Sequence, residues 1–190
     1  MIGFNALGRM GRLANQMFQY ASLKGIARNT GVDFCIPYYE EAVNDGIGNM
    51  LRTELFDSFD LQVNVSLLNK GHAPVVQERF FHFDEELFRM CPDHVDIRGY
   101  FQTEKYFKNI EDEIREDFTF KPEVQKLCKD IWKEIVTDEG YTEAIGLHVR
   151  RTDHLTKPTF HPVLPISYYE EALGRLPENI PVFVFTDDPS

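Results

Sequence analysis

The stretch that decides the fold is the N-terminal one, MIGFNALGRMGRLANQMFQYASLKGIARNTGVDFCIP, residues 1–37. Its short apolar opening, residues 1–7, predicts a first strand, and a turn containing Gly8 and Gly11 follows. Apolar residues then recur at three- and four-residue spacing over residues 13–30, which places them along one side of a helix. We therefore expect a strand, a glycine turn and a helix in this order.

The same stretch also contains the end of the helix and the next strand. Gly31 stands where a C-cap glycine belongs, because glycine readily adopts the left-handed conformation that ends many helices. The apolar run 32–37 then predicts a second strand. Strand, turn, helix and strand make a βαβ unit, so the fold class is α/β. Residues 38–95 show no clean period, and residues 95–101 predict a further strand.

A second unit of this kind lies at the other end of the chain. The helix that we expect to begin at Pro122 has one apolar face, and the run 144–149 predicts a strand covered on both faces. A helix over residues 168–176 and an apolar strand over 182–185 follow. The two units together predict an α/β protein with parallel, Rossmann-type sheets.

We expect these sheets to belong to two lobes. The first is an N-terminal α/β lobe, residues 1–140, and the second, residues 141–190, is the beginning of a ligand-binding Rossmann-like lobe. No helix follows the last predicted strand, so we expect the second lobe to be incomplete.

Composition and charge restrict what the protein binds. Twenty Lys and Arg residues against 31 Asp and Glu give a net charge of -11, which argues against nucleic acid and against an anionic membrane partner. No apolar run approaches the roughly 20 residues of a membrane span, and the N-terminus lacks a signal-peptide pattern, so we expect no transmembrane segment and a cytoplasmic location. Cys35, Cys91 and Cys128 lie far apart, which predicts reduced thiols and no zinc site.

A basic cluster follows the predicted strand 144–149. His148, Arg150, Arg151 and Asp153 form an H-x-R-R-x-D pattern there, and the carboxyl ends of parallel strands are where open α/β sheets bind their ligands. A planar guanidinium with fixed charge suits a diphosphate, whose negative charge grows as it leaves a sugar. The pattern predicts an anion site in which arginines act in place of a metal ion.

These residues also have structural interpretations. An Arg-Arg pair can be a solvated surface dipeptide, and His148, within an apolar strand, can be a core histidine bonded to the backbone. The position directly after a buried strand of an acidic protein favours the anion site.

A second polar cluster ends the last predicted strand. Thr186, Asp187 and Asp188 should border the same crevice as the arginines, and a carboxylate there can accept hydrogen bonds from a ribose or a guanine edge. Its structural interpretation is a helix N-cap. Asn15 and Gln16, near the start of the first helix, are uncharged hydrogen-bonding groups that we count among the candidate donor-binding residues, although a structural role suits them equally well.

Several metal and nucleophile motifs are missing from the sequence. It has no H-E-x-x-H, no G-x-S-x-G and no D-x-D between apolar strands, which argues against zinc proteolysis, hydrolase chemistry and metal-dependent sugar transfer. The turn at residues 8–11 lacks the spacing of a P-loop. Arginine-assisted group transfer with no metal or other cofactor fits the remaining residues best.

Three segments resemble motifs of a known family. Gly11–Ala21, GRLANQMFQYA, looks like the N-terminal signature of the α1,2-fucosyltransferases, glycosyltransferase family 11. Gly99–Phe107, GYFQTEKYF, resembles its middle motif, and His148–Asp153, HVRRTD, is similar to its donor motif. The donor motif and Thr186–Pro189, TDDP, are shared with α1,6-fucosyltransferases. The resemblance spans nearly the whole chain, and the three ordered motifs are more specific than any one of them.

The resemblance implies both a fold and an activity. The fold is GT-B-like, and the activity is a metal-independent, inverting transfer of fucose from GDP-fucose to a galactose-containing glycan. By this resemblance Arg150 and Arg151 hold the donor pyrophosphate, while His148 and Asp187 or Asp188 lie near the nucleoside or the pyrophosphate-binding loop. The chain ends before the C-terminal motifs with which the family completes its donor pocket.

Inversion requires a general base near the acceptor hydroxyl. Asp153 and His154 are positional candidates, and we favour Asp153. The α1,6 relatives place a glutamate a few residues after the arginines, but the loop 155–160 has no acid, so the resemblance does not assign the base. The sequence also departs from the family at Ala14, where glycine is usual.

Three other functions remain open. The chain can be a non-catalytic module that binds a nucleotide or glycan, an α1,6- or peptide-O-fucosyltransferase, or a purely structural α/β domain. The run Asn15–Ala21 favours the α1,2 family. A lipid-linked acceptor would place the protein at a membrane surface.

Overall fold

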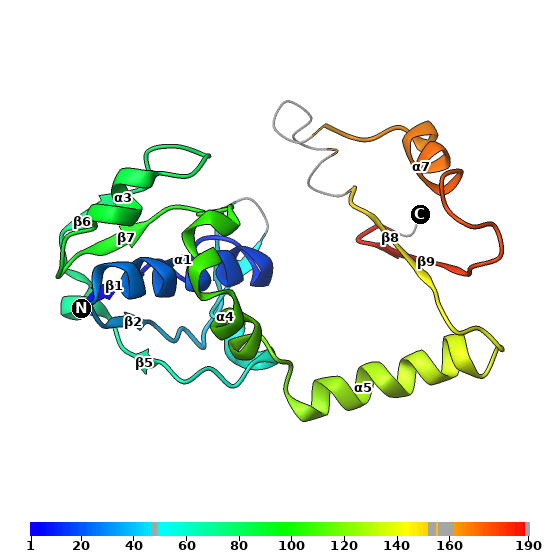
Figure 1. The fold of residues 1–190 in the computed structure, drawn as a ribbon, viewed down its shortest axis with the longest axis horizontal. Coiled ribbons are helices and arrows are strands. Elements are labelled where there is room, and N and C mark those ends of the chain that lie inside the picture. The colour runs from blue at the N-terminus through cyan, green and yellow to red at the C-terminus, as the bar shows by residue number, and fades with distance from the viewer. Residues whose placement is uncertain (47–48, 152–154, 156–161, 189–190) are drawn as a thin grey trace. The chain divides into compact units, whose positions relative to one another are not determined.

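The chain folds into two units, which can be followed by colour in Figure 1. The N-terminal unit comprises Met1–Val124 and the C-terminal unit Gln125–Ser190. The structure, a computed structural model, describes residues 1–46, 49–151, 155 and 162–188. The expected lobe boundary after residue 140 stays a prediction.

A five-stranded parallel sheet forms the centre of the N-terminal unit and confirms the α/β class. The strand order is β5-β2-β1-β7-β6. Gly3 of β1 pairs with Cys35 of β2 on one side and with Asp96 of β7 on the other. The strands are short: β1 is Ile2–Gly3, β2 Phe34–Ile36, β5 Asn64–Val65, β6 Val75–Gln77 and β7 Asp96–Arg98.

The helix predicted over residues 13–30 forms with those bounds, as α1, Leu13–Thr30. Gly31 ends it in the left-handed conformation, with φ 71°, and its backbone N–H donates to the carbonyl of Ala27, which confirms the predicted C-cap. Tyr20, Leu23 and Ile26 of this helix are fully buried in the main core. The spacing therefore identified the helix, but not its buried side: residues 19–27 are all buried, and Gln16 and Gln19, which lie off the apolar stripe, are fully buried, whereas Ala14 on it is exposed.

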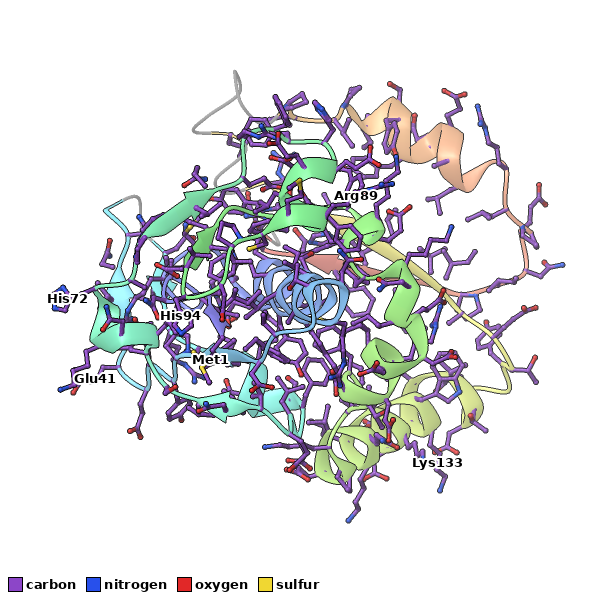
Figure 2. All side chains as sticks on the ribbon, turned by 60° about the vertical axis from the view of Figure 1, so that its left-hand side comes forward. Met1, Glu41, His72, Arg89, His94 and Lys133 are labelled. Atoms are coloured by element: carbon purple, nitrogen blue, oxygen red, sulfur yellow. The ribbon has the colours of Figure 1, made fainter. Side chains whose placement is uncertain are left out.

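The remaining elements surround this sheet and helix. The loop segments contribute β3 (Val43–Asn44), β4 (Met50–Leu51), α2 (Leu55–Ser58) and the 3₁₀ turn η1 (Leu68–Gly71). Beside α1 lie α3 (Glu85–Met90), η2 (Glu104–Tyr106) and η3 (Lys108–Ile110). The helix α4 (Glu111–Asp117) is joined to α1 by the ion pair of Lys24 with Asp117. At the start of the chain, the backbone N–H of His94 donates to the carbonyl of Met1, and Figure 2 shows these two residues side by side.

Aromatic residues dominate the core of the N-terminal unit. Phe4, Phe59, Phe101 and Tyr106 are almost fully buried, and Phe101 packs edge-on against Phe4 and Tyr106 with ring centroids 5.8 and 5.2 Å apart. Such edge-to-face pairs are the favoured aromatic geometry. This core holds the turn after β7 in place.

The C-terminal unit has one parallel strand pair, β8 (Ile145–Val149) and β9 (Val182–Thr186), and the helix α7 (Ile166–Leu173). Both strands lie within one residue of their predicted bounds, whereas the helix begins two residues earlier and ends three earlier than expected. The helix α5 (Pro122–Trp132), confirmed at Pro122, leads into this unit and continues as a π-helical turn, Lys133–Thr137.

The expectation that residues 144–149 form a strand covered on both faces is not met in the described part of the chain. Alternate residues of β8 are exposed, and Val184 and Phe185 of β9 are 57% and 62% exposed. Among the described residues β8 and β9 pair with each other alone. An apolar run indicates a strand, but the number of covered faces depends on how many other elements pack on it.

Candidate functional site

The register of β8 and β9 brings the two polar clusters to one edge. His148 pairs with Phe185 and Val149 with Thr186. Because the strands are parallel, Arg150 and Arg151 leave β8 where Asp187 and Asp188 leave β9. The expectation that both clusters border one place is therefore met for the described residues.

Arg151 interacts with both aspartates, through different atoms. Its backbone N–H donates to Oδ1 of Asp187 at 2.8 Å, and its guanidinium Nε lies 3.6 Å from Oδ2 of Asp188. This Nε is buried and lacks a hydrogen-bond partner among the described residues, although the Arg151 side chain as a whole is 42% exposed. The Nε atom of the guanidinium thus faces the carboxylate of Asp188 at ion-pair distance.

Thr186 fixes the turn that carries these aspartates. Its Oγ1 accepts a hydrogen bond from the backbone N–H of Asp188 at 3.1 Å and donates to the carbonyl of Asp188 at 3.0 Å. Asp187 satisfies a backbone amide of the neighbouring strand, Arg151 N–H, and this is a different contact from the helix N-cap considered above. The turn directs one carboxylate to the backbone of Arg151 and the other to its side chain.

His148 and Arg150 are exposed on the same side of β8, because residues two apart along a strand point the same way. His148 is therefore not a buried core histidine in this structure. Asp153 and His154, the two candidate bases, lie outside the described residues.

Asn15 and Gln16 belong to the N-terminal unit. Gln16 is fully buried, and its amide donates to the carbonyls of Gly11 and Arg52 and accepts from the backbone N–H of Glu54. Gln16 thus holds the loop before α1 in place, which favours the structural interpretation. Asn15 is half-buried, and its Oδ1 accepts a hydrogen bond from Nε2 of Gln102 at 2.7 Å.

An acidic side chain that the sequence did not predict lies at the start of α1. Glu54 Oε2 accepts from the backbone N–H of Leu13 at 2.7 Å, and Glu54 Oε1 pairs with Arg12 Nε at 2.7 Å. An acid at a helix N-terminus complements the helix dipole. The position is 41 residues away along the chain, so no local pattern signals it. This arrangement agrees with the absence of a P-loop.

The described residues hold no group of three His, Cys, Asp or Glu side chains placed to bind a metal ion. Within the same residues, no helix is both long and apolar enough to cross a membrane.

Comparison with known proteins places this chain among sugar transferases. Residues 1–189 match the family described as glycosyl transferase family 11. The chain is 30% identical over 131 residues to the O-antigen biosynthesis glycosyltransferase WbnK of Escherichia coli, covering 64% of this chain and 42% of that protein. It is 27% identical to the galactoside alpha-(1,2)-fucosyltransferase 2 of Oryctolagus cuniculus, covering 98% of this chain and 52% of that protein.

One solved structure has a similar fold. It is the crystal structure of the NodZ alpha-1,6-fucosyltransferase soaked with GDP-fucose, with a TM-score of 0.51 and 15% sequence identity over 99% of this chain and 71% of that one. This likeness supports the expected GT-B-like, Rossmann-type architecture. The chain spans about half the length of the curated relatives that it matches. From the match over residues 1–189, the chain belongs to glycosyl transferase family 11.

Proposed function

We propose that this chain carries the GDP-fucose-binding part of a galactoside α1,2-fucosyltransferase, which transfers fucose to a hydroxyl of a galactose-containing glycan with inversion. The family match and the galactoside alpha-(1,2)-fucosyltransferases among the relatives support this activity. The resemblance of the sequence to the α1,2 donor motif supports the choice of donor.

One observation carries the proposal. The two polar clusters meet where the parallel strands β8 and β9 end, with Arg151 joined to Asp187 by its backbone and to Asp188 by its guanidinium. This is the edge of a parallel sheet at which open α/β folds bind their ligands. A guanidinium with fixed charge and several N–H donors matches a diphosphate.

The proposed chemistry uses these arginines at the leaving group. Arg150 and Arg151 bind the donor diphosphate and stabilise the negative charge that develops on it as the bond to fucose breaks, without a metal. The acceptor hydroxyl attacks the anomeric carbon from the opposite face and loses its proton to a base, for which Asp153 is our candidate. His148 and Thr186 belong to the same strand ends and are proposed to border the nucleoside diphosphate.

In this proposal Asp187 and Asp188 act at the same site. Asp187 fixes the backbone of Arg151, and Asp188 lies beside its Nε. The terminal nitrogens of the guanidinium are proposed to bind the phosphates. Asn15 is proposed to lie near a bound sugar, whereas the contacts of Gln16 support a role in positioning the loop before α1.

There are two alternatives to this activity. The fold likeness to an alpha-1,6-fucosyltransferase favours that acceptor class as a second candidate. The other alternative is a chain that binds a nucleotide or glycan without turnover. Acceptor assays separate the first from the α1,2 activity, and donor binding without product formation identifies the second.

The test is calorimetric titration of the chain with GDP-fucose in EDTA, with GDP-mannose and UDP-galactose as controls. We expect binding that prefers GDP-fucose and needs no metal. Binding of all three with equal affinity, or of UDP-galactose alone, would contradict the donor assignment. Product analysis with a galactoside acceptor then tests the linkage.

A further inference from the structure

The middle motif, Gly99–Phe107, has no role in the donor site described above. It begins directly after β7 and therefore lies at the carboxyl edge of the N-terminal sheet. The described contacts of its first four residues show that this turn is strained and that hydrogen bonds from other elements hold it. Joining two elements does not require either feature.

Phe101 carries the strain. Its φ is 51°, in the left-handed region that a bulky residue rarely adopts, although its side chain is fully buried. Such conformations cost about 1 to 3 kcal/mol and occur most often at functional sites. Gly99, two residues before Phe101, has no room for a side chain, because a Cβ there would lie 2.5 Å from Cβ of Glu78.

Glu78 fixes this turn through hydrogen bonds to its backbone. Its Oε2 accepts from the backbone N–H of Tyr100 at 3.0 Å and of Phe101 at 2.9 Å, and its Oε1 accepts from the hydroxyl of Tyr106 at 3.2 Å. This half-buried carboxylate is thus bonded to three donors, two in the turn itself and one in η2.

Gln19 of α1 joins this turn to the loop after β1. Its Nε2 donates to the carbonyl of Met10 at 2.9 Å and to that of Gly99 at 3.4 Å. Its Oε1 is buried and has no hydrogen-bond partner among the described residues. An unsatisfied buried acceptor is unfavourable, and a hydroxyl donor that reached it between the two loops would remove that cost.

The exposed side chains at residues 100 and 102 of the turn are neutral. Tyr100 is 39% exposed, and Gln102 is exposed with its Nε2 bonded to Oδ1 of Asn15. An aromatic ring can cover the apolar C–H face of a pyranose while amides exchange hydrogen bonds with its hydroxyls. An anion would find no cation among these three side chains.

We propose that Tyr100, Gln102 and Asn15 form a binding subsite for a neutral hexose, which in the proposed reaction is the galactose unit of the acceptor glycan. This inference rests on the proposed function for the identity of the sugar, whereas the subsite lies wholly in the N-terminal unit and is separate from Arg150 and Arg151. Glu78 is its positioning residue, because it fixes the backbone that presents Tyr100 and Gln102.

The test is binding of methyl β-galactoside and lactose to the full chain, followed by saturation-transfer NMR and by amide chemical shifts, with methyl α-mannoside as the comparison sugar. We expect galactoside binding without GDP-fucose, with shifts at Tyr100, Gln102 and Asn15. Tyr100→Ala and Gln102→Ala should each weaken it roughly tenfold. Tyr141→Ala removes a tyrosine of similar exposure, 43%, from the C-terminal unit and should leave binding unchanged.

Glu78→Gln tests the positioning role. It should weaken galactoside binding while far-ultraviolet circular dichroism stays that of the parent, since a glutamine lacks the charge that strengthens the two backbone hydrogen bonds. Its single oxygen also cannot serve the two amides and the Tyr106 hydroxyl as the two carboxylate oxygens do. Galactoside affinity equal to the parent's in both Tyr100→Ala and Gln102→Ala overturns the subsite, as does a parent chain that binds no galactoside. Shifts at Tyr100 caused by GDP alone would also overturn it, by assigning the turn to the donor.

The two proposals fail in different ways. Galactoside binding with no GDP-fucose binding removes the proposed function and leaves the subsite. GDP-fucose binding together with unaltered galactoside affinity in the variants removes the subsite and leaves the proposed function.

Discussion

The backbone N–H of Arg151 donates to Oδ1 of Asp187 at 2.8 Å, joining two residues 36 positions apart in the sequence. The bond fastens the chain just past β8 to the chain just past β9, beyond the last backbone pairing of the two strands. A side chain that satisfies a backbone amide in this way sets the direction in which the chain leaves the strand. The position of the Arg151 guanidinium therefore depends on a residue of the other cluster.

Replacing Asp187 tests that dependence. Asp187→Ala should lower GDP-fucose affinity roughly tenfold, because it removes a charge-assisted hydrogen bond worth about 1.5 to 3 kcal/mol. Asp187→Asn should lose less, since the asparagine carbonyl still accepts from Arg151 N–H. Calorimetric titration of the three chains measures the difference.

Glu171→Ala is the matched control for this variant. Glu171, on α7, is an exposed acid of the same unit and also pairs with an arginine, Arg175, which lies two residues after the helix ends. Its loss should leave donor affinity unchanged. Equal affinity in Asp187→Ala and in the parent chain would show that the backbone bond does not position the donor site.

The arginines themselves give the second prediction. Arg150→Ala and Arg151→Ala should each remove most of the donor affinity, tenfold or more, because each loses a charge-assisted contact to phosphate. Arg151→Lys keeps the charge but not the planar fork, so it should restore only part of the binding. Titration with GDP as well as GDP-fucose shows whether the loss lies at the diphosphate; unchanged affinity in both alanine variants would end the assignment.

Local pattern was sufficient to predict much of this fold. The spacing of apolar residues gave α1 its bounds, and Gly31 marked its end, because both depend on interactions within a few residues. The two polar clusters could be placed at one edge since parallel strands share their direction. Such features follow from the local sequence and from the direction of the strands.

The contacts that the sequence could not predict are those between distant segments. Glu54 occupies the start of α1 from 41 residues away, and Glu78 holds the turn after β7 from 22 and 23 residues away. Gln16 has the sequence context of a ligand-binding residue, yet its amide is used by Arg52 and Glu54 within the fold. A polar side chain's partner is set by tertiary packing, which no local period encodes.

Gly25 gives a third prediction, on stability. A Cβ at this position in α1 would lie 1.9 Å from the carbonyl oxygen of Tyr106, which is backbone and cannot rotate away. Gly25→Ala should therefore destabilise the protein by about 3 kcal/mol or more, at or above the upper end of overpacking effects, despite the better helix propensity of alanine. Chemical denaturation followed by circular dichroism measures the change.

Gly31→Ala separates crowding from backbone conformation. No atom lies within 4 Å of a Cβ built there, but φ is 71°, so the expected cost is about 1 kcal/mol from the left-handed conformation alone. A Gly25→Ala variant as stable as Gly31→Ala would mean that α1 and η2 can separate without penalty.

The cysteines give a fourth prediction, on reactivity. Cys35 and Cys91 are buried, and burial raises the pKa of both thiols, that of Cys91 to about 11, whereas Cys128 on α5 is exposed. Because the thiolate is the reactive form, a disulfide reagent should modify one thiol per native chain and the other two only after unfolding. Cys128→Ser should abolish the fast reaction; two fast thiols would show that the N-terminal core opens readily.

The last prediction concerns acid stability and rests on Asp84, the N-cap of α3. Hydrogen bonds from the Arg79 guanidinium lower the pKa of Asp84 from 3.8 to about 2, against the opposing effect of burial, and the backbone N–H of Leu87 adds to the lowering. A depressed pKa in the folded state means that ionised Asp84 stabilises the fold above about pH 4 and that this stabilisation disappears as the pH falls towards 2.

Asp84→Asn isolates the charge, because asparagine is as good an N-cap as aspartate. At neutral pH the variant should be less stable than the parent by at most about 2 kcal/mol, since Arg79 is half exposed and solvent screens the pair. The difference should shrink between pH 4 and pH 2, where the parent loses the charge that the variant lacks. Urea unfolding across this range measures it, and a difference that stays constant or grows in acid would assign the effect of Asp84 to the cap alone.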